Sequence, residues 1–149
     1  MEITPLPKSI RGQMVGLDTM IFIYAFEEYP RYVSLLRSFF LALEKGDMEA
    51  VTSTLTITEC LVQPYRKNNF ALAAQYLALF RNFPHLSVIP VTDEIAERAA
   101  FLRAHYNLKT PDAIQLATAL VSGSRFFLTN DADLPSVEGT QILILDRLS

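Results

Sequence analysis

Residues 109–129 read KTPDAIQLATALVSGSRFFLT, and this stretch decides the fold. The Thr110–Pro111 pair is typical of an N-cap followed by the first residue of a helix, which we expect to run to Val121. Gly123 is placed to end that helix, and Arg125–Leu128 is an apolar run of the length expected for a buried strand. A helix that leads directly into a buried strand indicates an α/β domain with a parallel sheet.

The same alternation of strands and helices extends through the rest of the chain. Apolar residues recur at helical spacing on one face of several segments, and short apolar runs lie between them. Strands are expected at Met14–Leu17, Ala50–Thr52, Ser87–Val91 and Ile142–Leu145, and helices over Tyr32–Leu43, from the Ser53 cap to Val62 before Pro64, over Leu72–Phe83 before Pro84, and after the Thr92 cap. Pro90 predicts that its strand ends there or lies at an edge. The fold class is therefore a three-layer α/β/α sandwich around a parallel sheet of four to five short strands.

Length and composition indicate one folded unit. A chain of 149 residues can bury roughly 70% of its unfolded surface, and its 50% hydrophobic and 19% charged residues exclude a disordered protein. We interpret residues 1–13 as a lead-in and 14–149 as a single domain. Met20–Phe26 is the densest apolar run and is too short to span a membrane. Because Cys60 is the only cysteine and no signal peptide is visible, we expect a cytoplasmic protein without disulfides.

Four acidic residues follow, or lie shortly after, the expected strands. Asp18 comes directly after the first strand, Glu59 lies in the helix after the second, Asp112 opens the helix after Thr110–Pro111, and Asp131 follows the strand RFFLT. Ligands of open α/β sheets bind at the carboxyl ends of the strands, so we expect these four side chains at one edge of the sheet.

Converging carboxylates repel one another unless they take up protons or a cation. Mg²⁺ or Mn²⁺ prefers such oxygen ligands, and a cation of this kind can bind a phosphate oxygen and activate a water. The reaction class that fits best is metal-assisted hydrolysis of a phosphodiester. The sequence has neither a GxxxxGK[ST] loop nor a GxGxxG motif, which argues against a nucleotide phosphate cradle.

Three segments resemble the PIN domain family, in particular the VapC-type toxin ribonucleases of toxin–antitoxin pairs. They are VGLDTMIFIYAFE at 15–27, TLTITECLVQP at 54–64 and KTPDAIQLATALVSGSRFFLTNDADL at 109–134. Each motif is weak by itself, but all three occur in the order that the family has. The resemblance implies that 14–149 is a single PIN-like nuclease domain.

The resemblance also implies an activity and a set of residue roles. Asp18 would be the central metal ligand, and Glu59 would bind metal or orient the attacking water. Asp112 would be a metal ligand at the start of its helix, Asp131 would complete the acidic set directly or through water, and Thr129 would support the last loop. It implies an Mg²⁺- or Mn²⁺-dependent endoribonuclease that cleaves RNA, forms a homodimer and is neutralised by a small antitoxin protein. Two alternatives stay open: a PIN domain of RNA processing that is not a toxin, and a PIN-like module that binds RNA or protein without cleaving.

Other residues have plainer interpretations. Each of the four acids could be a solvated surface carboxylate, and Asp133 is expected to be a turn residue. His85 and His105 are expected at the surface or at helix caps, and Cys60 in the core. The aromatic residues Tyr32, Phe39 and Phe40 are expected to be core or dimer contacts rather than a stacking platform for RNA, and a surplus of the similar set Phe70, Tyr76 and Phe80 would mark a subunit interface.

The formal net charge of −3 at first argues against a nucleic-acid partner. If the four acids form one cleft, however, the rest of the chain holds twelve acidic side chains against 13 basic ones. The acidic excess then belongs to the predicted site rather than to the surface around it.

Overall fold

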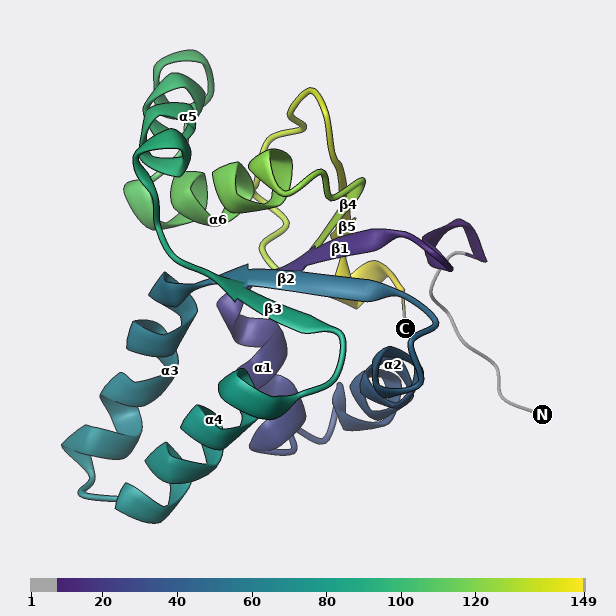
Figure 1. The fold of residues 1–149 in the computed structure, drawn as a ribbon, viewed down its shortest axis with the longest axis vertical. Helices are drawn as coiled ribbons and strands as arrows, with labels where there is room; N and C mark the ends of the chain where they lie inside the picture. The colour runs from purple at the N-terminus through teal and green to yellow at the C-terminus, as the bar shows by residue number, and fades with distance from the viewer. Residues whose placement is uncertain (1–7, 149) are drawn as a thin grey trace.

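The computed structural model describes residues 8–148, in which five parallel strands form one sheet between two helical layers (Figure 1). The strand order is β3-β2-β1-β4-β5. The strands are β1 (Met14–Leu17), β2 (Glu49–Ser53), β3 (Leu86–Ile89), β4 (Phe126–Thr129) and β5 (Gln141–Ile144). The predicted fold class is confirmed, with the sheet at the upper end of the expected strand number.

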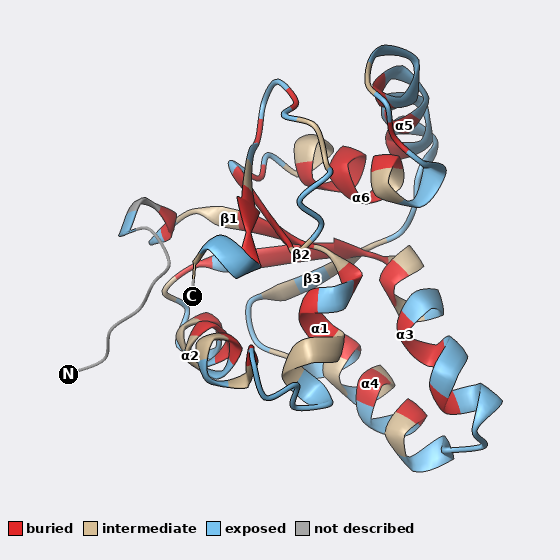
Figure 2. Cartoon of the chain, turned by 180° about the vertical axis from the view of Figure 1, so that it is seen from behind, coloured by how far each residue is buried: buried red, intermediate tan, exposed pale blue. Residues whose placement is uncertain are grey.

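The helices divide between the two faces of the sheet. One face carries α1 (Thr19–Phe26), α2 (Val33–Glu44), α3 (Thr54–Arg66) and α4 (Phe70–Asn82), and the other carries α5 (Asp93–His105) and α6 (Thr110–Val121). Short 3₁₀ turns lie at Lys8–Ile10 and Leu145–Arg147. Burial follows this layering, since the strands and the inward faces of the helices are buried and the outward faces are exposed (Figure 2).

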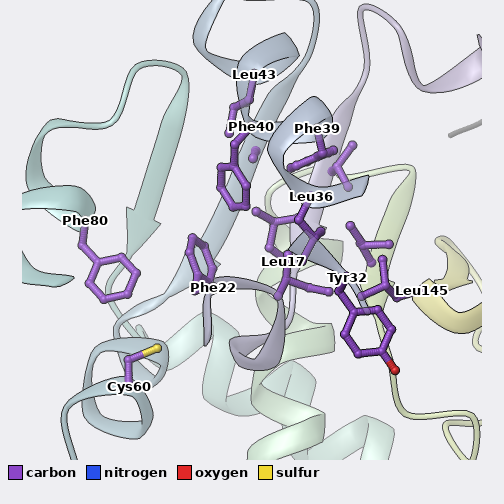
Figure 3. Packing of buried hydrophobic residues seen from close by; sticks show 14 of the residues in the cluster. Leu17, Phe22, Tyr32, Leu36, Phe39, Phe40, Leu43, Cys60, Phe80 and Leu145 are labelled. Atoms are coloured by element: carbon purple, nitrogen blue, oxygen red, sulfur yellow. The ribbon is translucent and has the colours of Figure 1, made fainter. Parts of the chain in front are cut away.

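Alternating strand residues supply two hydrophobic cores. On the four-helix side, Leu17 and Leu128 pack with a cluster in which Phe22 contacts Phe40 and Phe80 at centroid distances of 5.9 and 5.3 Å (Figure 3). On the opposite side, Phe127 packs with residues of α5 and α6. The side-chain period of two along a strand therefore sends successive residues to different cores.

Gly16 permits a close approach between the central strand and α6. A Cβ atom built on Gly16 would lie 2.7 Å from the Cβ of Ala119 and 3.0 Å from Cδ1 of Phe127. A side chain here would push α6 away from β1, so the glycine sets the height of the helix above the sheet.

Several sequence predictions outside the site are confirmed. Pro90 directly follows the edge strand β3, and Gly46 and Gly123 end their helices with φ of 85° and 79°. Cys60 is buried, and burial raises the pKa of its thiol to about 12, so it stays a protonated core residue. His85 and His105 are exposed.

The aromatic residues divide between the core and the surface. Tyr32, Phe39, Phe40, Tyr76 and Phe80 are buried in the first core, whereas Phe70 is 64% exposed. The prediction that the first set lies in the core holds within this single chain. A role in a dimer stays a prediction.

Two helix predictions are wrong in detail, and a third helix was not predicted. The helix expected to stop before Pro64 continues through it to Arg66, because Pro64 is buried and the packing of α3 on α4 outweighs the lost hydrogen bond. Lys109, not Thr110, occupies the N-cap position of α6, and the Thr110 hydroxyl accepts a hydrogen bond from Nη1 of Arg103 at 2.9 Å. The segment of α1 was not predicted as a helix, because its continuous apolar run shows no helical period.

The predicted lead-in, 1–13, is described in part. Ile10 is buried in the first core, and residues 1–7 lie outside the described residues. The division at residue 13 therefore stays a prediction.

Candidate active site

A cleft opens where the strand order reverses, between β1 and β4 at their carboxyl ends. The sheet runs outward from β1 through β2 in one direction and through β4 in the other, and such a switch point is where open α/β sheets bind ligands. The cleft has a volume of about 350 Å³. It is lined by Asp18, Thr19, Met20, Ile23, Glu59, Pro111, Asp112, Gln115 and Asp131. All four predicted acids therefore line the same cleft.

Asp18 is the N-cap of α1 and lies directly after β1. Its Oδ1 accepts a hydrogen bond from the Thr19 backbone N–H at 2.8 Å, and its Oδ2 accepts one from the Thr129 hydroxyl at 2.7 Å. Burial raises the pKa of this carboxyl, and although the two hydrogen bonds lower it, the charges of Asp112 and Glu59 raise it further. Ionisation of Asp18 in the metal-free protein therefore costs free energy, because the carboxylate is buried and repelled by neighbouring acids.

Thr129 joins Asp18 to the loop that carries Asp131. This buried residue ends β4, and its hydroxyl donates to Asp18 while accepting the backbone N–H of Asp131 at 3.1 Å. Asp131 in turn accepts the backbone N–H of Asp133 at 2.9 Å. The turn predicted at Asp133 is therefore closed by the side chain of Asp131.

Glu59 reaches the cleft from the second turn of α3. Its Oε1 accepts a hydrogen bond from the Thr19 hydroxyl at 2.7 Å. Thr19 thus contributes its backbone N–H to Asp18 and its hydroxyl to Glu59, and it holds two of the acids with two different groups.

Asp112 approaches from the opposite side of the sheet, in the first turn of α6. It is partly buried, and burial raises the pKa of its carboxyl. The negative charges of Asp131 and Glu59 raise that pKa further, and Lys109 lowers it. These acids are therefore close enough to repel one another, as their positions in one cleft require.

Residues 15–139 match the PIN domain family. The chain belongs to this family. A search of curated proteins gives no match to it. The resemblance stated from the sequence is thus confirmed at the level of the family.

Solved structures of PIN toxins are similar over most of the chain. A toxin–antitoxin complex from Klebsiella pneumoniae matches with a TM-score of 0.66 and 25% identity, covering 90% of this chain and 98% of that one. VapBC2 from Rickettsia felis, bound to a DNA fragment from its promoter, gives 0.67 and 14%, with 88% and 98% covered. The sarcin-ricin loop cleaving toxin VapC20 from Mycobacterium tuberculosis gives 0.63 and 16%, with 80% and 91% covered.

The donor set of this PIN domain fits a hard divalent cation in its chemistry. All four acids offer carboxylate oxygens, and Mg²⁺ is held in proteins through one or two carboxylates and several waters. Within residues 8–148, no three His, Cys, Asp or Glu side chains are arranged so that they could hold a metal ion as they stand. We therefore expect few direct ligands, and the remaining acids would act through water.

The hydroxyl and amide groups in and beneath the cleft were not predicted from the sequence. Thr19 and Thr56 stand in the sequence only as members of the segments at 15–27 and 54–64, and Ser53 only as a helix cap. Gln115 was part of the helix pattern. The signal that could have found them is a polar side chain on the inward face of a helix, where a buried group needs a partner.

Within the described residues, no helix is long and apolar enough to cross a membrane.

The raised pKa of Asp112 predicts a pH-dependent effect of Asp112→Asn on the metal-free protein. Because the native state holds this proton more tightly than the unfolded state, ionisation destabilises the fold as pH rises above 3.8. In EDTA, we expect Asp112→Asn to be more stable than the wild type at pH 7 and to lose that advantage below pH 3.8. Urea unfolding at several pH values measures the difference.

Asp93→Asn is the matched control, because Asp93 also lies in the first turn of a helix but outside the cleft. It isolates the loss of the favourable interaction with the helix dipole. A stability gain that was the same at pH 3 and pH 7 would contradict the electrostatic explanation.

Proposed function

We propose that this PIN domain is a metal-dependent endoribonuclease that hydrolyses RNA phosphodiester bonds and acts as the toxin of a VapBC-type toxin–antitoxin pair. The observation that carries the proposal is the cleft between the carboxyl ends of β1 and β4. Four acidic side chains line it, two from the segments that follow these strands and two from α3 and α6. The likeness to the toxin of the Klebsiella pneumoniae toxin–antitoxin complex supports the assignment.

Each acid has a role in the proposal. Asp18 is the central ligand for Mg²⁺ or Mn²⁺ in this proposal, because its carboxylate is fixed by two hydrogen bonds in the cleft that the other three acids line. Glu59, oriented by Thr19, binds metal or positions the attacking water, and Asp112 and Asp131 complete the ligand set directly or through water. The bound cation would neutralise the acids, polarise a phosphate oxygen and lower the pKa of its water.

The charge distribution supports RNA as the substrate. Outside the four acids, basic side chains slightly outnumber acidic ones, so the negative charge is concentrated where a cation would bind. A metal-loaded cleft would then accept a phosphate that the metal-free cleft repels. Weak RNA binding in EDTA and stronger binding with metal are expected.

The proposal includes a small antitoxin protein as partner, a homodimer and a cytoplasmic location. The antitoxin is supported by the Klebsiella pneumoniae complex, which contains one. Its test is expression in a bacterial host: the toxin is expected to arrest growth, and co-expression of a small protein encoded next to it is expected to restore growth. Growth arrest without any neutralising neighbour would favour a PIN nuclease of RNA processing.

The activity itself is tested by metal removal. Purified protein is incubated with total RNA and with a labelled single-stranded RNA, in Mg²⁺, in Mn²⁺ and in EDTA. Cleavage products are expected with either metal and none in EDTA, with activity returning when metal is added back. Intact RNA under every metal condition would contradict the proposal and favour a binding module.

A further inference from the structure

A network of buried polar side chains lies beneath the acidic cleft, and its members are residues other than the four acids. Thr19, Thr52, Ser53, Thr56 and Gln115 are each at most 6% exposed. They come from the start of α1, from the end of β2, from α3 and from α6, so the network joins both faces of the sheet. Burying five polar side chains is costly unless each of them has a partner.

The Gln115 amide lies at the centre of this network. Its Nε2 donates to Thr19 Oγ1 at 3.1 Å and to Thr56 Oγ1 at 2.8 Å. Its Oε1 accepts the Ser53 hydroxyl at 2.9 Å. Both N–H donors and one of the two acceptor positions of Oε1 are thus used within the protein.

The network has one assignment of protons that satisfies every group. Thr52 donates to the carbonyl oxygen of Leu17 at 3.0 Å, so it must accept from Thr56, 2.6 Å away. Thr56, having given its proton to Thr52, accepts from Gln115. Thr19 also accepts from Gln115, and its own proton is left for Glu59.

Thr56 determines which way the amide points, because its proton is committed to Thr52 and it can only accept from the amide. The Ser53 hydroxyl oxygen accepts the Leu55 backbone N–H at 3.2 Å, and with the amide in this orientation the Ser53 proton goes to Oε1 of Gln115. If the amide turned over, Oε1 would face Thr19 and Thr56 and would compete with Glu59 for the Thr19 proton. The orientation of the amide therefore decides whether Glu59 is held.

We propose that Gln115 is a positioning residue for the active site. It acts through Thr19: by donating to that hydroxyl, it directs the Thr19 proton to Oε1 of Glu59 and fixes this carboxylate at the edge of the cleft. The role concerns the orientation of Glu59 and is separate from any contact with substrate. Its kinetic consequence rests on the proposed nuclease function, but the hydrogen-bond direction does not.

The first test uses the unaltered protein and needs no activity. NMR is expected to show slowly exchanging hydroxyl protons for Thr19 and Thr56, each with cross-peaks to the side-chain amide protons of Gln115. Amide protons found on the Ser53 side instead would overturn the proposal. This result is obtained whether or not the protein cleaves RNA, so it separates failure of the inference from failure of the proposed function.

The second test is a double-mutant cycle on cleavage kinetics. Gln115→Met keeps a similar side-chain shape and removes the amide, and we expect it to lower kcat about tenfold with little change in KM, the scale of one lost hydrogen bond. Because Gln115 acts through Thr19, the same substitution in a Thr19→Val background is expected to leave kcat unchanged. Equal losses in both backgrounds would overturn the proposal.

Thr118→Val is the matched control. Thr118 is a buried polar residue on the same helix, and its hydroxyl bonds only to the carbonyl oxygen of Ile114 within α6. Its loss is expected to lower stability and leave kcat unchanged, which separates general destabilisation of α6 from the effect on Glu59. An equal fall in kcat would count against the inference.

If Gln115→Met does not fold, Thr52→Val tests the same step from the other side. It removes the acceptor of the Thr56 proton, which is then free to donate to the Gln115 amide, and the NMR signals of the Thr19 hydroxyl are expected to shift or double as the amide turns over. Unchanged signals would overturn the proposal.

Discussion

Asp18→Asn is expected to lower RNA cleavage about 1,000-fold or more at saturating Mg²⁺. The substitution keeps an oxygen that can accept the Thr19 backbone N–H, but it removes a buried charge that interacts with those of Asp112 and Glu59. A bound metal contributes several kcal/mol of transition-state stabilisation, and each 1.4 kcal/mol corresponds to roughly a factor of ten in rate. Single-turnover cleavage of a labelled RNA measures the loss.

Asp133→Asn is the control for this experiment. Asp133 is an exposed acid in the same loop as Asp131, but its side chain does not line the cleft. We expect wild-type cleavage from this variant. Because all proteins are purified in the same way, the comparison also excludes a contaminating nuclease, and an Asp18→Asn variant as active as the wild type would place the active site elsewhere.

Gly16→Ala is expected to lower the free energy of unfolding by about 1–3 kcal/mol, the usual cost of overpacking a core. The added methyl group would lie 2.7 Å from the Cβ of Ala119, between a central strand and a helix that are both buried. Because α6 carries Asp112 and Gln115, we also expect cleavage to fall. Urea unfolding measures the stability change.

The cause can be isolated by a compensating substitution. Ala119→Gly removes the atom that clashes, at a cost of about 1 kcal/mol for glycine within a helix. In that background, Gly16→Ala is expected to cost much less than in the wild type, giving a coupling energy in the double-mutant cycle. Ala117→Gly, in the same buried helix, is the control and should give no such rescue.

Much of the fold could be predicted because buried strands appear as short apolar runs, whereas helices show apolar residues at helical spacing. The strand following Gly123 and the helix before it were visible from short apolar runs and punctuating residues. Four acids could be placed at one edge because parallel strands all end on the same side of a sheet. In each case, the information lies within a few neighbouring residues.

The remaining features depend on contacts between distant segments. Pro64 lies inside α3 because α4 packs against that helix, which no local pattern encodes. Gln115 looks like one polar residue in an apolar helix until Ser53 and Thr56, from another part of the chain, are placed beside it. Such partners could not be assigned from one sequence, because the identity of a buried polar residue does not indicate which distant group it forms a hydrogen bond with.

The insertion of β4 beside β1 has a consequence for the growing chain. Asp18 is among the first residues of the domain to be synthesised, yet Thr129, which holds its Oδ2, comes more than a hundred residues later. A fragment that ends before β4 has an open edge on β1 and lacks both Thr129 and Asp131. Whatever chemistry the cleft performs is therefore possible only after β4 and the loop behind it have been synthesised, and termination before β4 yields a protein without a complete cleft.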